Sequence, residues 1–335
     1  MAGLSRLRKR PSFKRILLSE YLVLYLCVIY FAIFAFNLPG FATLANVGVI
    51  LSNMLPLLAM AVGMTIVLIA GGIDLSIIAT VLLSSVLGAK VMSTQDGWLA
   101  GNALAVPAAI LTMLAVGLVI GAFNGLAVTR LNMPPFIITL AVLLFGSGSA
   151  VWITESNLIP GLPPSFTVIG TGSVLFVPIG LLVVGVLVLS AHFLLSNTLY
   201  GRWLYAIGTN VRVARISGVP VDRCILGTYL ISGVCAVVAS ILITGRLLSG
   251  SPTLIDEVVL LDVIGAAVIG GASIYGGKGK IVWTIFGVIL LTLIDNSLLI
   301  LGLSSFTITI CKGAVILLAA LLDALRTRLL VAEGS

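Results

Sequence analysis

The sequence predicts an all-α membrane protein that crosses the bilayer about ten times, with both termini in the cytoplasm. Hydrophobic residues make up 60% of the 335 residues and charged residues only 9%, whereas about a quarter of an ordinary globular domain is charged. The mean hydropathy is +1.27, and apolar runs of membrane-spanning length recur along the whole chain. This composition excludes a soluble enzyme, because a soluble protein with so few charged residues could not cover its surface with them.

Ten apolar runs are separated by polar residues or by glycine and proline. The weakest separation is the Gly71-Gly72 pair between the second and third runs. We expect a single transmembrane domain over residues 21–325, a basic cytoplasmic segment at 1–20 and a cytoplasmic tail at 326–335. The runs lie at about 21–37, 46–70, 73–92, 105–129, 135–155, 173–195, 224–245, 258–275, 281–302 and 306–325.

Basic residues decide the predicted orientation. With a cytoplasmic N-terminus, 15 of the 18 Lys and Arg residues lie on the inner side, Lys90 and Arg246 lie outside, and Lys312 lies within a span. Merging the second and third runs would place the basic loop 196–223 outside, against the positive-inside rule. The net charge of +7 is therefore a topology signal, and we expect no nucleic-acid partner.

The sequence shows no catalytic or metal-binding pattern. His192 is the only histidine, and the four cysteines lack metal-ligand spacing. The glycine-rich stretch before Lys278 is not a phosphate loop, because Ala272 occupies the first glycine position and Gly279 replaces the Ser or Thr. We expect no enzymatic activity, no metal and no cofactor bound by this chain.

The loop 196–223 has helix signals. Asn210 can cap a helix that begins VRVARIS, and Gly218 followed by Pro220 is a stop signal. A short capped helix can dock onto a soluble partner. The loop can also act only as a basic anchor that sets orientation, and the spacing does not separate these two readings.

Three features inside the apolar region carry polar groups or helix breaks. Asp295 and Lys312 both lie roughly 9–11 Å from the outer end of their spans, so we predict an ion pair joining these spans, with a structural role favoured over solute contact. Asp74 follows Gly71-Gly72, and a helix N-cap is favoured there over a broken helix beside a pathway. Asn124 and Pro135 suit packing roles, with Pro135 in the first turn of a helix.

Five segments, in order over roughly residues 40–325, resemble the permease subunits of bacterial ABC importers for ribose, xylose, arabinose, galactose and similar solutes. These segments are AGGIDLS (70–76), GAFNGLAVTRLNMPPFIITLAV (121–142), GRWLYAIGTNVRVARISGV (201–219), AAVIGGASIYGGKGK (266–280) and the IDNSL…LGLSSF…KGAVILLAALLD stretch (294–323). The combination of five motifs is specific, whereas each motif alone is weak.

The resemblance implies an all-helical permease of the type II importer kind in the bacterial inner membrane. Two permease copies, identical or related, would surround a path for a monosaccharide or similar small polar solute. A periplasmic solute-binding protein would dock outside, a separate ATPase subunit carrying ATP and Mg would dock inside, and membrane lipid would surround the pair.

The resemblance also assigns candidate residues. Those matching the ATPase-coupling segment are Arg202, Asn210, Val211, Arg212, Ala214, Arg215, Ser217 and Gly218. Those matching path or helix-break motifs are Gly71, Gly72, Asp74, Ser76, Asn124, Pro135, Phe136 and Thr139.

The chain also departs from the family pattern. Leu260 stands where the family usually has a Glu before Leu-Asp, Gly265 replaces an Ala and Ala272 replaces a Thr, which leaves a different solute or a partner permease open. The alternative function is an ion-gradient-driven secondary transporter of a small polar solute. It would need titratable groups near the midplane, and the chain offers few.

Overall fold

The computed structural model describes residues 21–175, 177–255 and 258–332, so the basic segment predicted at 1–20 lies outside the described residues. In the described part, all regular structure is helical except one small antiparallel hairpin, β1 (Ser173–Val174) with β2 (Val177–Pro178).

Ten apolar helices account for most of the described chain. Six are long and apolar enough to cross a membrane: α3 (Leu44–Ile69), α5 (Ala105–Arg130), α6 (Pro135–Thr154), α8 (Ile179–Asn197), α11 (Val221–Leu247) and α13 (Ile281–Ile300). Four others have a shorter apolar stretch: α2 (Leu22–Asn37), α4 (Ile77–Met92), α12 (Val258–Ile269) and α14 (Ser305–Ala332). Each predicted apolar run overlaps one of these helices.

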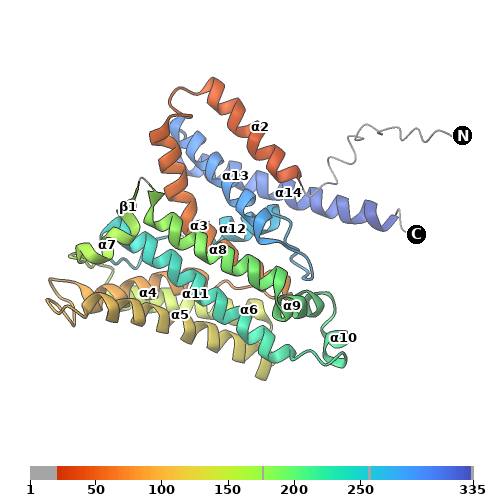
Figure 1. The fold of residues 1–335 in the computed structure, drawn as a ribbon, viewed down its shortest axis with the longest axis horizontal. Helices are drawn as coiled ribbons and strands as arrows, with labels where there is room; N and C mark the ends of the chain where they lie inside the picture. Colours follow the sequence, from red (N-terminus) through yellow and green to blue (C-terminus); the bar gives the residue numbers. More distant parts are fainter. Residues whose placement is uncertain (1–20, 176, 256–257, 333–335) are drawn as a thin grey trace, which may run out of the picture.

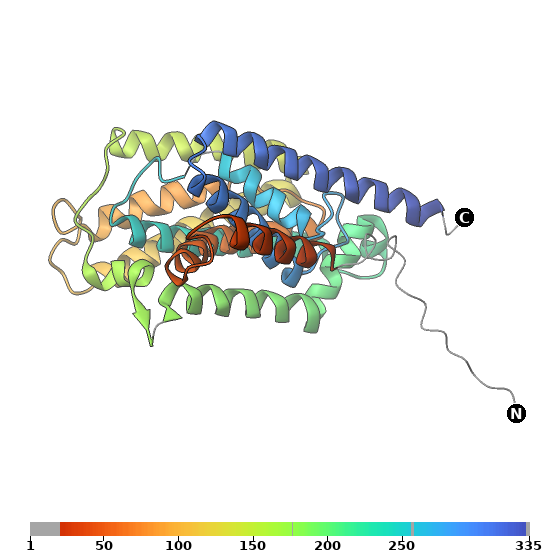
Figure 2. The same ribbon diagram turned by 90° about the horizontal axis from the view of Figure 1, so that it is seen from above.

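The apolar helices run broadly along one direction, so their connections gather at two ends of the molecule (Figure 1). One end holds the short helices α9 (Leu199–Thr209) and α10 (Val211–Ile216) and the C-terminal end of α14. The opposite end holds α7 (Pro164–Thr171) and the hairpin, and the view from above shows the same separation (Figure 2). The bundle therefore has two distinct faces where partners can bind.

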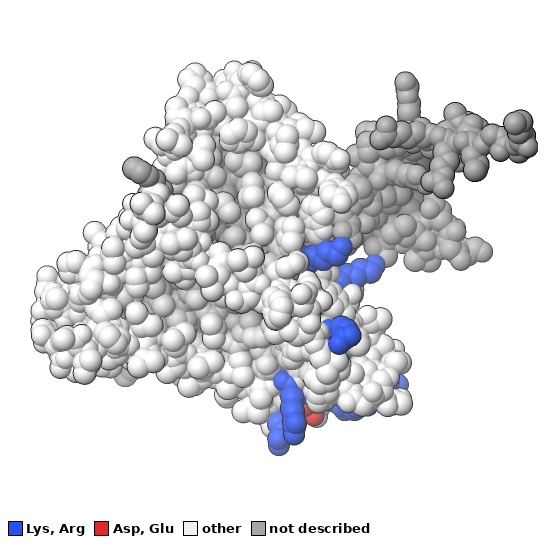
Figure 3. Space-filling model, in the orientation of Figure 1, with Lys and Arg blue, Asp and Glu red and all other residues white. Residues whose placement is uncertain are grey.

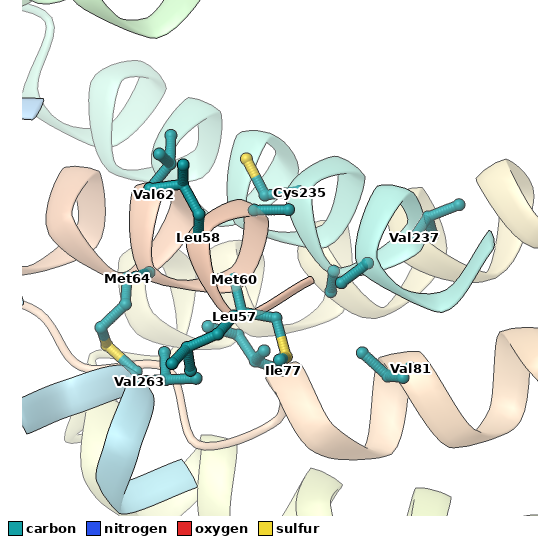
Figure 4. Close-up of a cluster of buried hydrophobic side chains, with 14 of the residues drawn as sticks. Leu57, Leu58, Met60, Val62, Met64, Ile77, Val81, Cys235, Val237 and Val263 are labelled. Atoms are coloured by element: carbon teal, nitrogen blue, oxygen red, sulfur yellow. The ribbon is translucent and has the colours of Figure 1, made fainter. Parts of the chain in front are cut away.

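Helix α3 forms the centre of the bundle. Every residue from Met54 to Ile69 is buried, which is expected of a helix that is apolar on all sides. Figure 4 shows its side chains meeting Cys235 of α11, Ile77 of α4 and Val263 of α12. The end of α3 thus lies deep in the protein, where a displacement of α3 would also displace the helices packed against it.

Helices α5 and α11 pack backbone against backbone through glycine. A Cβ added at Gly117 would lie 2.6 Å from the carbonyl oxygen of Gly233, and a Cβ at Gly233 would collide with the carbonyl of Gly117. Gly121 meets the backbone of Tyr229 in the same way, one helical turn along. Small residues at a spacing of four allow membrane helices to approach this closely.

The structure corrects three predicted boundaries. The sixth run was predicted from residue 173, but α8 begins at Ile179 because residues 173–174 pair with 177–178 in the hairpin. The eighth run was predicted to reach 275, but α12 ends at Ile269, where Gly271 adopts φ +84°. Helix α14 continues to Ala332, beyond the predicted end at 325, and α9 was not predicted.

Filling the α5–α11 contact should destabilise the protein. We expect Gly117→Leu to cost about 1–3 kcal/mol or more, because the added side chain forces the two backbones apart. Thermal unfolding in detergent, followed by size-exclusion chromatography, measures this loss. Gly185→Leu on α8 is the matched control, since a Cβ there meets no atom within 4 Å. Equal stability of the two variants would contradict the close-packing account.

Candidate functional site

The loop between α8 and α11 is ordered by a side-chain cap. Asn210 separates α9 from α10, and its Oδ1 accepts hydrogen bonds from the N–H groups of Arg212 at 3.0 Å and Val213 at 3.1 Å. These bonds satisfy backbone donors that the first turn of α10 leaves free. The cap predicted at Asn210 is confirmed.

The surface of α10 combines positive charge with apolar side chains. Ile216 is 88% exposed and Val213 is 58% exposed, and Arg212 and Arg215 lie beside them on the surface. Ala214 faces inward and is buried. Large apolar side chains on an exposed helix beside arginines are typical of a protein-binding surface.

The remaining candidate coupling residues lie around this helix. Arg215 forms an exposed ion pair with Asp222 at 3.0 Å, a kind of contact that contributes about 0–1 kcal/mol. Gly218, with φ +82°, follows the end of α10 as predicted. Val211, Ser217 and Gly218 are exposed, and Arg202 is exposed on α9 rather than on α10.

Helix α9 is anchored to the rest of the protein by two tyrosines. The Tyr200 hydroxyl donates to the carbonyl of Cys224 at 2.9 Å, and the Tyr205 hydroxyl donates to the carbonyl of Gly279 at 2.7 Å. Burial raises the pKa of the Tyr205 hydroxyl above its usual value, so this group stays protonated and remains a donor. The short helices are therefore attached firmly to the bundle.

The segment between α3 and α4 is a true helix break. Gly71 adopts φ +81°, and the N–H groups of Gly71 and Gly72 donate to the carbonyls of Leu68 and Val67, which closes the end of α3. Four residues later the chain enters α4 after Ser76. The Gly71-Gly72 pair separates two helices, as predicted.

Asp74 lies in this break and is the centre of a buried polar network. Its Oδ1 accepts hydrogen bonds from the N–H of Ser76 at 3.0 Å and from the Ser76 hydroxyl at 2.6 Å. Its Oδ2 accepts a bond from the Ser232 hydroxyl of α11 at 2.7 Å. Asn124 of α5 donates to the Ser76 hydroxyl at 2.7 Å, while the Oδ1 of Asn124 is buried without a partner in the described chain.

The network unites some of the predicted residues and leaves others apart. Asp74, Ser76, Asn124 and Thr139 are all buried, and Thr139 donates to the carbonyl of Pro135 at 2.8 Å. Pro135 begins α6, as predicted, whereas Phe136 is exposed beside it. Sequence reasoning missed Ser232, because no local pattern signals a contact 158 residues from Asp74.

A second buried polar site joins α12, α13 and α14. Lys312 Nζ lies 3.1 Å from Asp295 Oδ1 and 2.6 Å from Asp262 Oδ2. Lys312 and Asp262 are buried, whereas the side chain of Asp295 is 41% exposed. The sequence predicts a pair of Lys312 with Asp295 alone, because the packing of α12 against α14 is not visible in the sequence.

Comparison with known proteins identifies the family of this chain. A family model described as "Branched-chain amino acid transport system / permease component" matches residues 46–322, which include the helix break, the α9–α10 segment and Lys312.

The chain belongs to this permease family.

Curated relatives narrow the resemblance to sugar permeases. The ribose import permease of Escherichia coli strain K12 is 35% identical over 318 residues, which cover 94% of this chain and 96% of the relative. The ribose import permease of Bacillus subtilis strain 168 is 38% identical, covering 78% of this chain and 80% of the relative. The galactofuranose transporter permease of Escherichia coli strain K12 is 30% identical, covering 83% and 79%.

These matches confirm the resemblance to permeases of sugar ABC importers that the five sequence motifs indicated. The family is one of transport permeases rather than an enzyme class. No solved structure was found to match the chain.

The Lys312 site yields a stability prediction. Lys312→Met should cost about 3–5 kcal/mol, because it leaves the buried Asp262 carboxylate without its partner. Asp295→Asn should cost less, since Asp295 is half-exposed and Lys312 keeps Asp262. Thermal unfolding of the purified permease in detergent gives both values.

The control for this prediction is the double change Asp262→Asn with Lys312→Met, which removes both buried charges and should recover part of the loss. Exchanging the charges of Asp295 and Lys312 is a poorer test, because it places two carboxylates beside each other at residues 262 and 312. A Lys312→Met protein as stable as the Asp295→Asn protein would contradict the assigned geometry.

Proposed function

We propose that this chain is the membrane-spanning permease subunit of an ABC importer and forms the path for a monosaccharide or similar small polar solute. Membership in the permease family and the sugar permeases among its relatives support this function. The single structural observation that carries it is the exposed apolar and basic surface of α10 at one end of the bundle.

The ATPase subunit binds this surface in the proposal. Ile216 and Val213 supply the apolar contact, while Arg212 and Arg215 supply charge that can steer an acidic partner. The Asn210 cap fixes the helix direction, so α10 can be gripped as a rigid unit. ATP and Mg are held by that partner.

Ten spans with both termini in the cytoplasm fit the arrangement of charge. In the face shown in Figure 3, the blue Lys and Arg side chains gather at the end where α9 and α10 lie, and the opposite end is white. The positive-inside rule assigns the α9–α10 end to the cytoplasm of a bacterial inner membrane.

The other partners follow from the same proposal. A periplasmic solute-binding protein docks at the end that carries α7 and the hairpin, and a second permease, either an identical or a related copy, completes the path. The helix-break residues around Asp74 hold α4, α5 and α11 together at the edge of that path.

Reversal of charge on α10 should release the ATPase. We expect a P-loop ATPase to co-purify with the detergent-solubilised permease from its native membrane, and the Arg212→Glu, Arg215→Glu double change to abolish this recovery. Mass spectrometry of the co-purified proteins, with ATP hydrolysis as a second readout, measures the result.

The matched control is the double change Arg130→Glu, Arg246→Glu, which alters net charge equally at exposed residues away from α10. Loss of the ATPase with both double changes would show a general charge effect and contradict docking on α10. Absence of any ATPase from a stable extract of the unchanged permease would overturn the importer proposal.

Energy coupling separates the importer from a secondary transporter. Solute uptake into vesicles should persist when proton and sodium gradients are collapsed, provided that ATP is present on the cytoplasmic side. Uptake that stops with the gradients and ignores ATP would favour the secondary transporter.

A further inference from the structure

Three segments far apart in the sequence meet near the end of α9, just before α10. We call their meeting point the glycine junction and define it by Gly71, Gly208, Gly276 and Gly277. Gly71 follows α3, Gly208 lies near the end of α9, and the other two lie between α12 and α13. The N–H of Gly277 donates to the carbonyl of Ile69 at 2.9 Å, which joins the α12–α13 loop to the end of α3.

Gly208 sits at the centre of the junction, where no side chain fits. A Cβ at Gly208 would collide with the carbonyl of Ile69 and the N–H of Gly277. A Cβ at Gly276 would lie 2.7 Å from the carbonyl of Gly208 and 2.9 Å from the Cα of Gly71. The three backbones are therefore in direct contact, so a shift of one displaces the others.

The two loops that meet Gly208 are built alike. After α3, the N–H groups of Gly71 and Gly72 close the helix. After α12, Gly271 donates to the carbonyl of Val268 at 2.8 Å and Ala272 donates to that of Ala267 at 2.9 Å, which repeats the pattern. Helices α3 and α12 thus end in the same hydrogen-bond pattern, and the loop after each one reaches Gly208.

Tyr205 fastens α9 to the same place. Tyr205 lies about one helical turn before Gly208 on α9, and its hydroxyl donates to the carbonyl of Gly279 at 2.7 Å. A Cβ at Gly279 would lie 2.8 Å from the Ile69 side chain, so the loop that accepts this bond also packs closely against the end of α3. The Tyr205 bond can be removed without adding any atom to the junction.

The junction leads from α10 into the bundle. Asn210 follows Gly208 by two residues and α10 begins one residue later, and Gly71 is three residues from Asp74. Asp74 and Ser76 in turn bond Ser232 of α11 and Asn124 of α5. Movement of α10 thus has a contiguous route of backbone and buried polar contacts to α3, α4, α12 and α13.

We propose that Gly208 is a positioning residue that passes displacement of α10 to the α3–α4 and α12–α13 loops, with Tyr205 holding it in register. The proposal rests on the proposed function, because it assumes that a partner ATPase moves α10. Helix α10 is continuous in the chain with α9 and α11, and the junction adds a direct contact of this segment with α3 and the α12–α13 loop.

The test measures whether ATP moves the spans beyond the junction. Nitroxide labels are placed at Gln95→Cys after α4 and Leu299→Cys on α13, both exposed, with Cys311→Ser to remove the half-buried native thiol. Pulsed electron resonance gives the distance distribution in the permease with its co-purified ATPase, without nucleotide and after trapping with ATP and vanadate. This readout needs no knowledge of the solute.

We expect the trapped state to shift the distance distribution in the labelled parent and the shifted fraction to fall at least about fivefold in Gly208→Ala and in Tyr205→Phe. The ATPase should still co-purify and hydrolyse ATP, since α10 itself is unchanged. Matched controls are Gly185→Ala, at an open glycine, and Tyr275→Phe, at a 93% exposed tyrosine.

Each alternative result contradicts the proposal. A full shift in Tyr205→Phe and Gly208→Ala, or no shift in the parent, would show that the junction does not carry the movement. Equal loss of ATPase recovery and distance shift would indicate a merely structural role. If Gly208→Ala fails to fold, Tyr205→Phe decides the matter, and loss of the ATPase from the parent refutes the proposed function instead.

Discussion

Direct backbone contact at glycine is the constraint on which the rest of this structure depends. Lipid solvates apolar side chains as well as protein does, so membrane helices gain most from close packing and buried hydrogen bonds. Gly117 and Gly233 bring α5 and α11 together, and Gly208 brings α9 against the end of α3 and the α12–α13 loop. Ser232, beside Gly233 on α11, donates its hydroxyl to Asp74, so this carboxylate is hydrogen-bonded both by α11 and by Ser76.

The buried polar groups are tolerated because packing supplies their partners. Asp74 accepts three hydrogen bonds at a position where water is excluded, and Lys312 is shared by Asp262 and Asp295. Removing one member of such a set leaves another buried and unpaired, which costs more than the bond itself contributes. These networks therefore specify which helices meet, and their half-exposed member, Asp295, is the one that tolerates change.

The functional proposal joins a surface to this interior. Helix α10 has the exposed apolar and basic character of a docking element, and its cap makes it rigid. Two residues before that cap, Gly208 contacts the end of α3 and the α12–α13 loop. In the proposed importer, a capped docking helix that follows this contact closely has the geometry needed to convert movement of an ATPase partner into movement of the spans.

The sequence by itself determined the helical membrane class, the ten apolar segments, the Asn210 cap, the Pro135 helix start and the break at Gly71-Gly72, because these depend on hydropathy and on contacts within a few residues. Family membership also followed from the five motifs. Two predicted boundaries were wrong. The sixth run was predicted to include the hairpin residues, and the eighth run was predicted to continue past the end of α12. In both places hydropathy alone predicted a continuous helix, whereas glycine and proline interrupt it. Only the tertiary structure decided that Ser232 bonds Asp74, that Asp262 shares Lys312 and that Gly208 touches Ile69 and Gly277, because each contact joins residues separated by tens to hundreds of positions and arises from helix packing that no local pattern records.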